Sequence, residues 1–250
     1  MFKNTQELVL TSLIGAIIIM LSVIPQLGFI LIFPAVSITI VHIPVLIGVM
    51  TLRRPSAIIF GLLYGFGSLF AAYTRGTTPV DLAFVNPLIS VLPRVLFTLA
   101  AYELFRGFKW LQKKMTYELS LALIGAILLG SFVLLGQYIQ SQSVMSDILV
   151  YVLLFVFYSG LMYFVYSQTK THQSFMFVTL TALFSTLIHT VLVLTALIGF
   201  KPALFNFTFG ESVDLIYGIM VSNGLLEAII AVLVVTPVVR AIQLATEVRT

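Results

Sequence analysis

The sequence predicts an all-α integral membrane protein that forms a single transmembrane domain over residues 1–250. Hydrophobic residues make up 60% of the chain and charged residues only 9%, and the hydrophobic residues gather in eight long runs. A water-soluble globule has neither property. A hydrocarbon core of about 30 Å needs about 20 helical residues to cross it, and most of these runs approach that length. We therefore expect eight transmembrane helices.

The expected spans follow one another along the whole chain. The second run is short for a span, whereas the eighth is long enough to tilt or to protrude from the bilayer. The runs cover residues 8–24, 37–52, 56–73, 87–105, 119–138, 147–166, 175–200 and 213–239.

The basic residues give the expected orientation. If the N-terminus is cytoplasmic, Arg75 and Lys201 are the basic loop residues outside, which agrees with the positive-inside rule. Both termini are then cytoplasmic in a cell membrane, and residues 140–146 are external. The net charge of +4 comes from the inner loops, so it implies no nucleic-acid partner. The inner basic residues are Lys3, Arg53, Arg54, Arg106, Lys109, Lys113, Lys114, Lys170, Arg240 and Arg249.

Two outer connectors and one glycine pair carry structural signals. Residues 25–36 (PQLGFILIFPAV) are apolar and bounded by prolines, so we expect them to fold over or into the bundle as a lid. Residues 74–86 (TRGTTPVDLAFVN) have the composition of an ordered polar loop. Gly61 and Gly65 in the third run predict a close approach between helices.

Ionisable residues inside the spans are costly and usually face the interior of a bundle or a cavity. Arg94 and Glu227 lie at similar distances from the inner ends of their spans, about 18–20 Å from the boundary at ~1.5 Å per residue. We expect them to form an ion pair. Such a pair could fix the fourth helix against the last, or its arginine could meet a ligand.

Polar residues form stripes on three of the expected helices, mostly in their outer halves. Such stripes predict a polar cavity open to the outside, although each hydroxyl or amide could instead bond to a neighbouring backbone carbonyl. The stripes consist of Asn86, Ser90 and Arg94, of Thr186, His189 and Thr190, and of Asn223 and Glu227.

The sequence gives no indication of a metal site or a cofactor. It contains no cysteine and no H-E-x-x-H motif, and the two intramembrane histidines, His42 and His189, are expected at different depths. A P-loop motif is also absent, so the chain is not expected to use ATP by itself.

Six segments together resemble a known family. The chain is similar to the substrate-binding S components of energy-coupling factor (ECF) vitamin transporters. This resemblance covers the first four spans and the last two. The segments are LTSLIGAIIIMLSVIP, SITIVHIPVLIG, GLLYGFGSLFAA, FVNPLISVLPRVLF, HTVLVLTALIGF and NGLLEAIIAVLVVTPVVRAI.

The resemblance implies a six-helix core that captures a micronutrient from outside and is not an enzyme. It implies as partners a transmembrane coupling subunit and two ATPase subunits. The small residues Ser12, Gly15 and Ala16 match the family's docking face on the first helix, although ordinary internal packing explains them too. Residues 116–171 then form an inserted helical hairpin.

The segments VHIPVLIG and VNPLISVLPR are most similar to pantothenate-type members, so pantothenate is the expected substrate. Its carboxylate needs a cationic partner. Because Glu227 is expected to neutralise Arg94, we expect Arg75 or Lys201 to be the more available partner. The expected hydrogen-bonding residues are Asn86, Ser90, His189, Thr190 and Asn223.

Three alternatives stay open at this point. The chain could be an S component for another vitamin, or a scaffold that only recruits partners. It could also be a small membrane enzyme that uses His42, His189 and Glu227 as acid and base groups. The different depths expected for the two histidines argue against the enzyme.

Overall fold

The structure, a computed structural model, describes residues 5–33, 36–142, 146–171, 173–201, 204 and 208–247. Within these residues it is nearly all helical, and seven helices are long and apolar enough to cross a membrane. This confirms the predicted class. The long helices are α1 (Thr5–Val23), α4 (Arg54–Arg75), α7 (Leu92–Gln112), α8 (Tyr117–Gln142), α9 (Asp147–Thr169), α10 (Met176–Phe200), and a last one made of α11 (Phe209–Ile219), the π-turn η3 (Met220–Gly224) and α12 (Leu225–Glu247).

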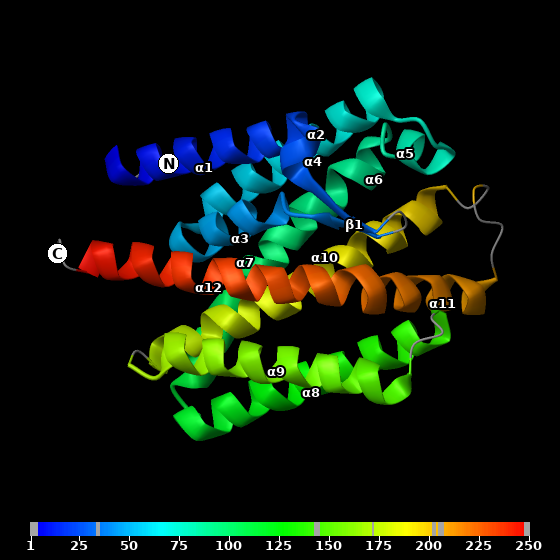
Figure 1. Cartoon of the computed structure of the whole chain (residues 1–250). Coiled ribbons are helices and arrows are strands. Elements are labelled where there is room, and N and C mark those ends of the chain that lie inside the picture. Colours follow the sequence, from blue (N-terminus) through cyan, green and yellow to red (C-terminus); the bar gives the residue numbers. More distant parts are fainter. Residues whose placement is uncertain are drawn as a thin grey trace.

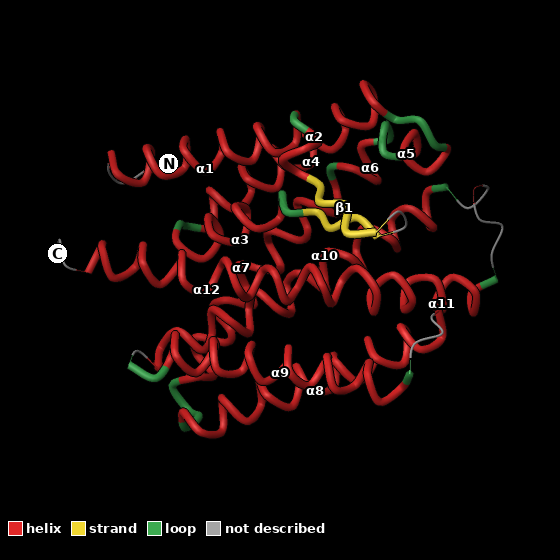
Figure 2. The backbone as a smooth tube through the Cα atoms, viewed as in Figure 1, coloured by secondary structure: helices red, strands yellow, loops and turns green. Residues whose placement is uncertain are grey.

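The second expected span is different from the prediction. Residues 37–52 contain only the ten-residue helix α3 (His42–Thr51). Before it, the short helix α2 (Pro25–Gly28) leads into two antiparallel strands, β1 (Phe29–Phe33) and β2 (Val36–Thr39). Aromatic and β-branched residues dominate this stretch and favour strands, and pairing satisfies their backbone groups within the bundle. Figure 2 shows the strand pair inside an otherwise helical arrangement of the described residues.

β1 lies within residues 25–36, which were predicted to be a lid, and β2 begins at the last of these residues. β2 packs against α12 and the π-turn, so the hairpin lies against the last helix (Figure 1). Residues 34 and 35 of the predicted lid are outside the described residues. Whether the hairpin opens and closes stays a prediction.

The second connector that was predicted to be outside, residues 74–86, is an ordered loop, as predicted. It contains α5 (Pro79–Ala83), and α6 (Pro87–Ser90) follows directly after it. Thr78 and Asp81 form a reciprocal capping box at the start of α5, with Thr78 N donating to Asp81 Oδ2 at 3.0 Å. Partial burial alone would raise the pKa of Asp81, but hydrogen bonds from Thr78 and Thr77 outweigh it and hold the pKa below its ordinary value.

The glycine pair on α4 makes the close approach that the sequence predicts. A Cβ on Gly61 would lie 2.9 Å from the Cα of Val95, and one on Gly65 would lie 2.7 Å from the Cα of Val91. Both neighbours belong to backbone at the start of α7, so α4 and α7 pack almost directly on each other. The predicted packing role of these glycines is therefore confirmed.

Helices α8 and α9 pack on each other and lie along one edge of the bundle (Figure 1). They occupy the region predicted as an inserted hairpin. The start of α1 and the end of α12 lie at one end of the bundle, and the end of α8 and the start of α9 lie at the other. Residues 143–145 of that connection are outside the described residues.

This arrangement allows the predicted orientation to be tested. Because the chain has no native cysteine, a single introduced cysteine reports its own side of the membrane. We expect Ser146→Cys, an exposed position beside α9, to react with an impermeant maleimide in intact cells. Lys113→Cys, exposed after α7, should react only after the membrane is opened. The reverse pattern would contradict the predicted topology.

Candidate ligand-binding site

A cavity of about 720 Å³ lies among the hairpin, α4, α7, α10 and the last helix. It brings together residues that are far apart in the sequence, from Ser22 at the end of α1 to Glu227 at the start of α12. Five of the seven predicted binding residues line it: Arg75, Arg94, His189, Thr190 and Asn223. The predicted cavity is therefore present, with polar and apolar residues together in its lining, and its opening to the outside stays a prediction.

Arg94 lies in the wall of this cavity and is only 7% exposed. Its Nη1 donates to the carbonyl oxygen of Ile89 at 2.8 Å. That carbonyl is free because Pro93, four residues later, has no N–H to bond it. The guanidinium carbon also lies 5.1 Å from the ring centre of Phe84 and 5.6 Å from that of Tyr64. Its Nε has no hydrogen-bond partner among the described residues.

Glu227 faces the same cavity and is 7% exposed. Its Oε1 accepts a hydrogen bond from the backbone N–H of Thr39 at 2.8 Å. Among the ion pairs of the described residues there is none between Glu227 and Arg94. The predicted ion pair is therefore wrong, because each group bonds to backbone that the sequence pattern did not reveal: a freed carbonyl and the end of a strand.

The two intramembrane histidines lie side by side, contrary to the prediction. The ring centres of His42 and His189 are 6.1 Å apart and the rings are nearly parallel, with Phe97 4.8 Å and Tyr64 5.4 Å from His189. The prediction that the two histidines lie at different depths is wrong because α3, which begins at His42, starts inside the bundle after the hairpin. Neither ring nitrogen of His189 has a hydrogen-bond partner among the described residues. His189 also lines the cavity.

Arg75 reaches the cavity but its guanidinium is already engaged. Nη1 donates to the carbonyl oxygen of Val23 at 2.7 Å and Nη2 to that of Ser22 at 2.8 Å. These carbonyls end α1 and have no partner within their own helix. Arg75 therefore ties α1 to α4, and the expectation that it is the more available carboxylate partner is wrong. Lys201, the other cation that was predicted to be outside, is not among the cavity-lining residues.

Asn86 and Ser90 do not line the cavity. The side chain of Asn86 caps α6 by accepting from the N–H of Leu88 at 3.0 Å, and the hydroxyl of Ser90 donates to the Asn86 carbonyl at 3.1 Å. Thr190 likewise donates to the Thr186 carbonyl, at 3.3 Å, although it does face the cavity. For these hydroxyls the alternative of a local backbone bond is correct.

Sequence reasoning missed several residues of this site. Tyr64 and Phe84 flank Arg94, and Ser68 lines the same wall as Arg75. The spacing of Tyr64, Ser68 and Arg75 along α4 could have revealed them, because these positions share one face of a helix with small residues. Thr39 ends β2, where the sequence predicted a transmembrane helix, and Phe84 lies in the ordered connector, where no single side chain stood out as a site residue.

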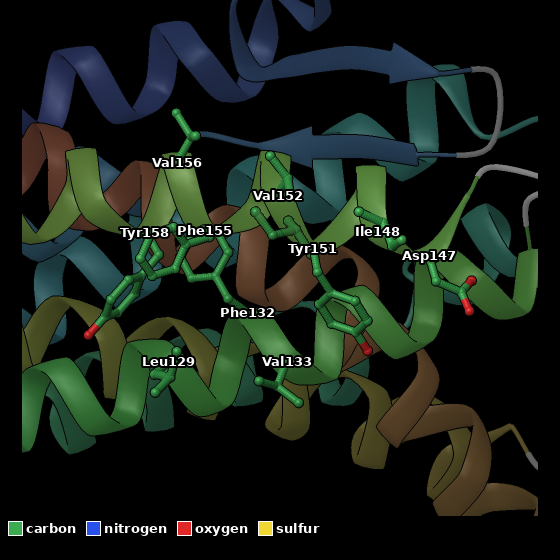
Figure 3. A pocket seen from close by; sticks show the side chains of 11 residues that line it. Leu129, Phe132, Val133, Asp147, Ile148, Tyr151, Val152, Phe155, Val156 and Tyr158 are labelled. Atoms are coloured by element: carbon green, nitrogen blue, oxygen red, sulfur yellow. The ribbon is translucent and has the colours of Figure 1, made fainter.

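A second hollow, of about 560 Å³, lies on the outer surface of α8 and α9. Figure 3 shows its lining side chains, among them Phe132, Phe155 and Val156, arranged along the two helices. Its lining is apolar and aromatic except for Asp147 at one end and the tyrosine hydroxyls. Such a surface suits acyl chains rather than a water-soluble ligand.

The predicted docking residues on α1 do not share one environment. Ser12 and Ala16 are exposed on the outer side of the helix. Gly15 is buried, and a Cβ there would lie 3.0 Å from Cδ1 of Leu63 on α4. Gly15 therefore has the internal packing role that was the alternative, whereas Ser12 and Ala16 form a small-residue face that another helix could reach.

The comparison with known families agrees with the geometry. The model of the family described as ECF transporter, substrate-specific component, matches residues 6–139, which is more than half of the chain. The match continues through most of α8, so the interpretation of residues 116–171 as an insert stays a prediction. No curated protein matches the chain. The chain thus belongs to the family of substrate-specific components of ECF transporters and is a substrate-binding membrane subunit.

Proposed function

We propose that this subunit captures a small water-soluble vitamin that carries a carboxylate, with pantothenate as the first candidate. The observation that carries this proposal is the side chain of Arg94. It is buried, it lines the cavity, and its Nε lacks a partner within the described residues. A buried donor without a partner costs about 1–3 kcal/mol or more, and a bound carboxylate would remove that cost through charge-assisted hydrogen bonds.

The rest of the cavity suits a ligand with further polar groups. His189 has unpartnered ring nitrogens, and Asn223 and Thr190 line the neighbouring wall. The volume of about 720 Å³ is within the range of small-molecule sites, about 300–1,000 Å³. Pantothenate offers a carboxylate, an amide and two hydroxyls, so each of these groups could meet a partner.

The direct test is binding by the purified, unmodified protein. Native mass spectrometry of gently solubilised protein should show a co-purified ligand of vitamin size. Calorimetric titration should then give a saturable signal for pantothenate, and weaker or no signal for biotin, riboflavin and thiamine. Binding of one of these three in place of pantothenate would overturn the substrate and leave the S-component assignment standing.

We propose that the exposed small-residue face of Ser12 and Ala16 is where the transmembrane coupling subunit docks, and that two ATPase subunits complete the transporter. Ala16→Trp adds bulk where a partner helix must approach closely. We expect the complex yield and the uptake to fall at least tenfold, with ligand binding by the isolated subunit unchanged. Co-purification with the coupling subunit measures this.

The matched control for this substitution is Ala126→Trp, at an exposed alanine on α8. It adds the same bulk to another lipid-facing helix and should leave the yield of the complex unchanged. If Ala16→Trp does not lower that yield, the face on α1 is not the contact.

A further inference from the structure

Glu227 is a buried acidic residue inside a membrane protein. It forms none of the ion pairs found among the described residues, and Thr39 supplies its hydrogen bond. The carboxylate faces a cavity that also contains Arg94 and His189. A buried charge of this kind is costly and marks a functional group more often than a structural one. A single N–H bond from a strand end does not explain why an acidic residue stands at this position.

The π-turn in the last helix helps to place Glu227 in the cavity. Leu215, Ile219, Asn223 and Glu227 all line the cavity at intervals of four residues. On a regular α-helix of about 3.6 residues per turn, each step of four residues moves the next side chain about 40° further around the helix axis. The π-turn at Met220–Gly224 has more residues per turn and offsets this rotation. It therefore keeps Asn223 and Glu227 on the wall that Leu215 and Ile219 begin.

The π-turn also fits closely against α10. A Cβ on Gly224 would lie 3.3 Å from the hydroxyl of Thr190, which itself lines the cavity. The wide turn is therefore packed against the site rather than turned toward lipid. π-turns within α-helices occur frequently at functional sites, and this one carries an amide and a carboxylate into the same space.

We propose that Glu227 is a ligand-binding residue that accepts hydrogen bonds from a hydroxyl or ammonium group of the substrate. The substrate class is then two-ended: an anionic group meets Arg94, and a donor-bearing group meets Glu227. This inference rests on the proposed function, because it assumes a ligand in the same cavity. A contact with Glu227 would favour ligands that carry a hydrogen-bond donor. The contact between Arg94 and a carboxylate makes no such distinction.

Two probes that differ only in donors test this. Pantothenate has two hydroxyls, and N-(3,3-dimethylbutanoyl)-β-alanine has the same carboxylate and amide without them. We expect the unmodified protein to bind pantothenate at least about tenfold more tightly than the probe without hydroxyls. Glu227→Gln should reduce this ratio to about threefold, because a neutral acceptor makes a weaker bond, and Glu227→Met should reduce it to about one. An unchanged ratio in both variants would overturn the proposal.

Thermal stability without ligand gives a second, independent measurement. Glutamine can still accept the N–H of Thr39, so Glu227→Gln should leave the unfolding midpoint unchanged or raise it. A fall of more than about 3 °C, which corresponds to roughly 1 kcal/mol in a protein of this size, would show that the charge is structural and would overturn the proposal. If neither probe binds the unmodified protein, pantothenate is the wrong substrate, and this measurement alone decides the role of Glu227.

Discussion

Replacement of Arg94 by glutamine is expected to weaken pantothenate binding about 30-fold or more. Removal of one partner of a buried, hydrogen-bonded charge pair costs about 2–5 kcal/mol, and Arg94 is the buried cation that lines the cavity with an unpartnered Nε among the described residues. Glutamine keeps a polar side chain of moderate length but cannot offer a charged, forked donor. Calorimetric titration of the purified variant measures the loss.

Two further variants separate binding from stability. Arg94→Lys keeps the charge without the planar fork, so it should recover part of the affinity. Arg75→Gln removes the bonds to the carbonyls of Ser22 and Val23, so it should lower the unfolding midpoint and leave the affinity within about threefold, since bonds to a charged donor are worth about 1.5–3 kcal/mol each in stability. If Arg75→Gln abolishes binding while Arg94→Gln does not, the two roles are reversed.

The largest loss of stability is expected from Gly61→Val. A Cβ at this position would lie 2.9 Å from the Cα of Val95. Backbone cannot move aside as the end of a flexible side chain can, so α4 and α7 would have to separate. Overpacking typically costs about 1–3 kcal/mol, and a clash with backbone should reach at least the upper end of that range. The thermal midpoint in detergent should fall by about 6 °C or more.

Gly130→Val is the matched control, because among the described residues no atom beyond the neighbouring backbone of α8 lies within 4 Å of a Cβ at that glycine. Both variants replace glycine with the same β-branched residue inside a helix, so their intrinsic propensity terms cancel. Equal midpoints for the two variants would show that the contact between α4 and α7 is looser than the geometry indicates.

Most of the helical architecture was predictable because its cause is local. Runs such as 119–138 and 175–200 are apolar over the length that a bilayer requires, and the bilayer leaves their backbone few alternatives to a helix. The prediction of a transmembrane helix over residues 37–52 was wrong because the first of these residues form a strand that pairs with the preceding segment. The hydropathy of a segment does not show which other segment it pairs with.

The site was predictable in its composition but not in its pairings. Polar spacing correctly placed Arg94, His189 and Asn223 in one cavity. Depth counting then failed for His42, because it assumes that every span is a straight helix from one boundary to the other. The ion pair of Arg94 and Glu227 failed for a related reason. Pro93 leaves a backbone carbonyl free for Arg94, and the end of β2 offers a backbone N–H to Glu227. The positions of charged residues in a sequence do not reveal such backbone partners.

The π-turn has a consequence for how this protein is compared with its relatives. A π-turn corresponds to an α-helix with one residue added, and one residue rotates everything that follows by about 100°. A relative whose last span is a continuous α-helix would need one residue fewer to present an equivalent carboxylate. Alignments of this helix should therefore place a single-residue gap within residues 220–224. Without that gap, Glu227 would be matched to a lipid-facing position in such a relative, and a shared binding group would be read as a difference in specificity.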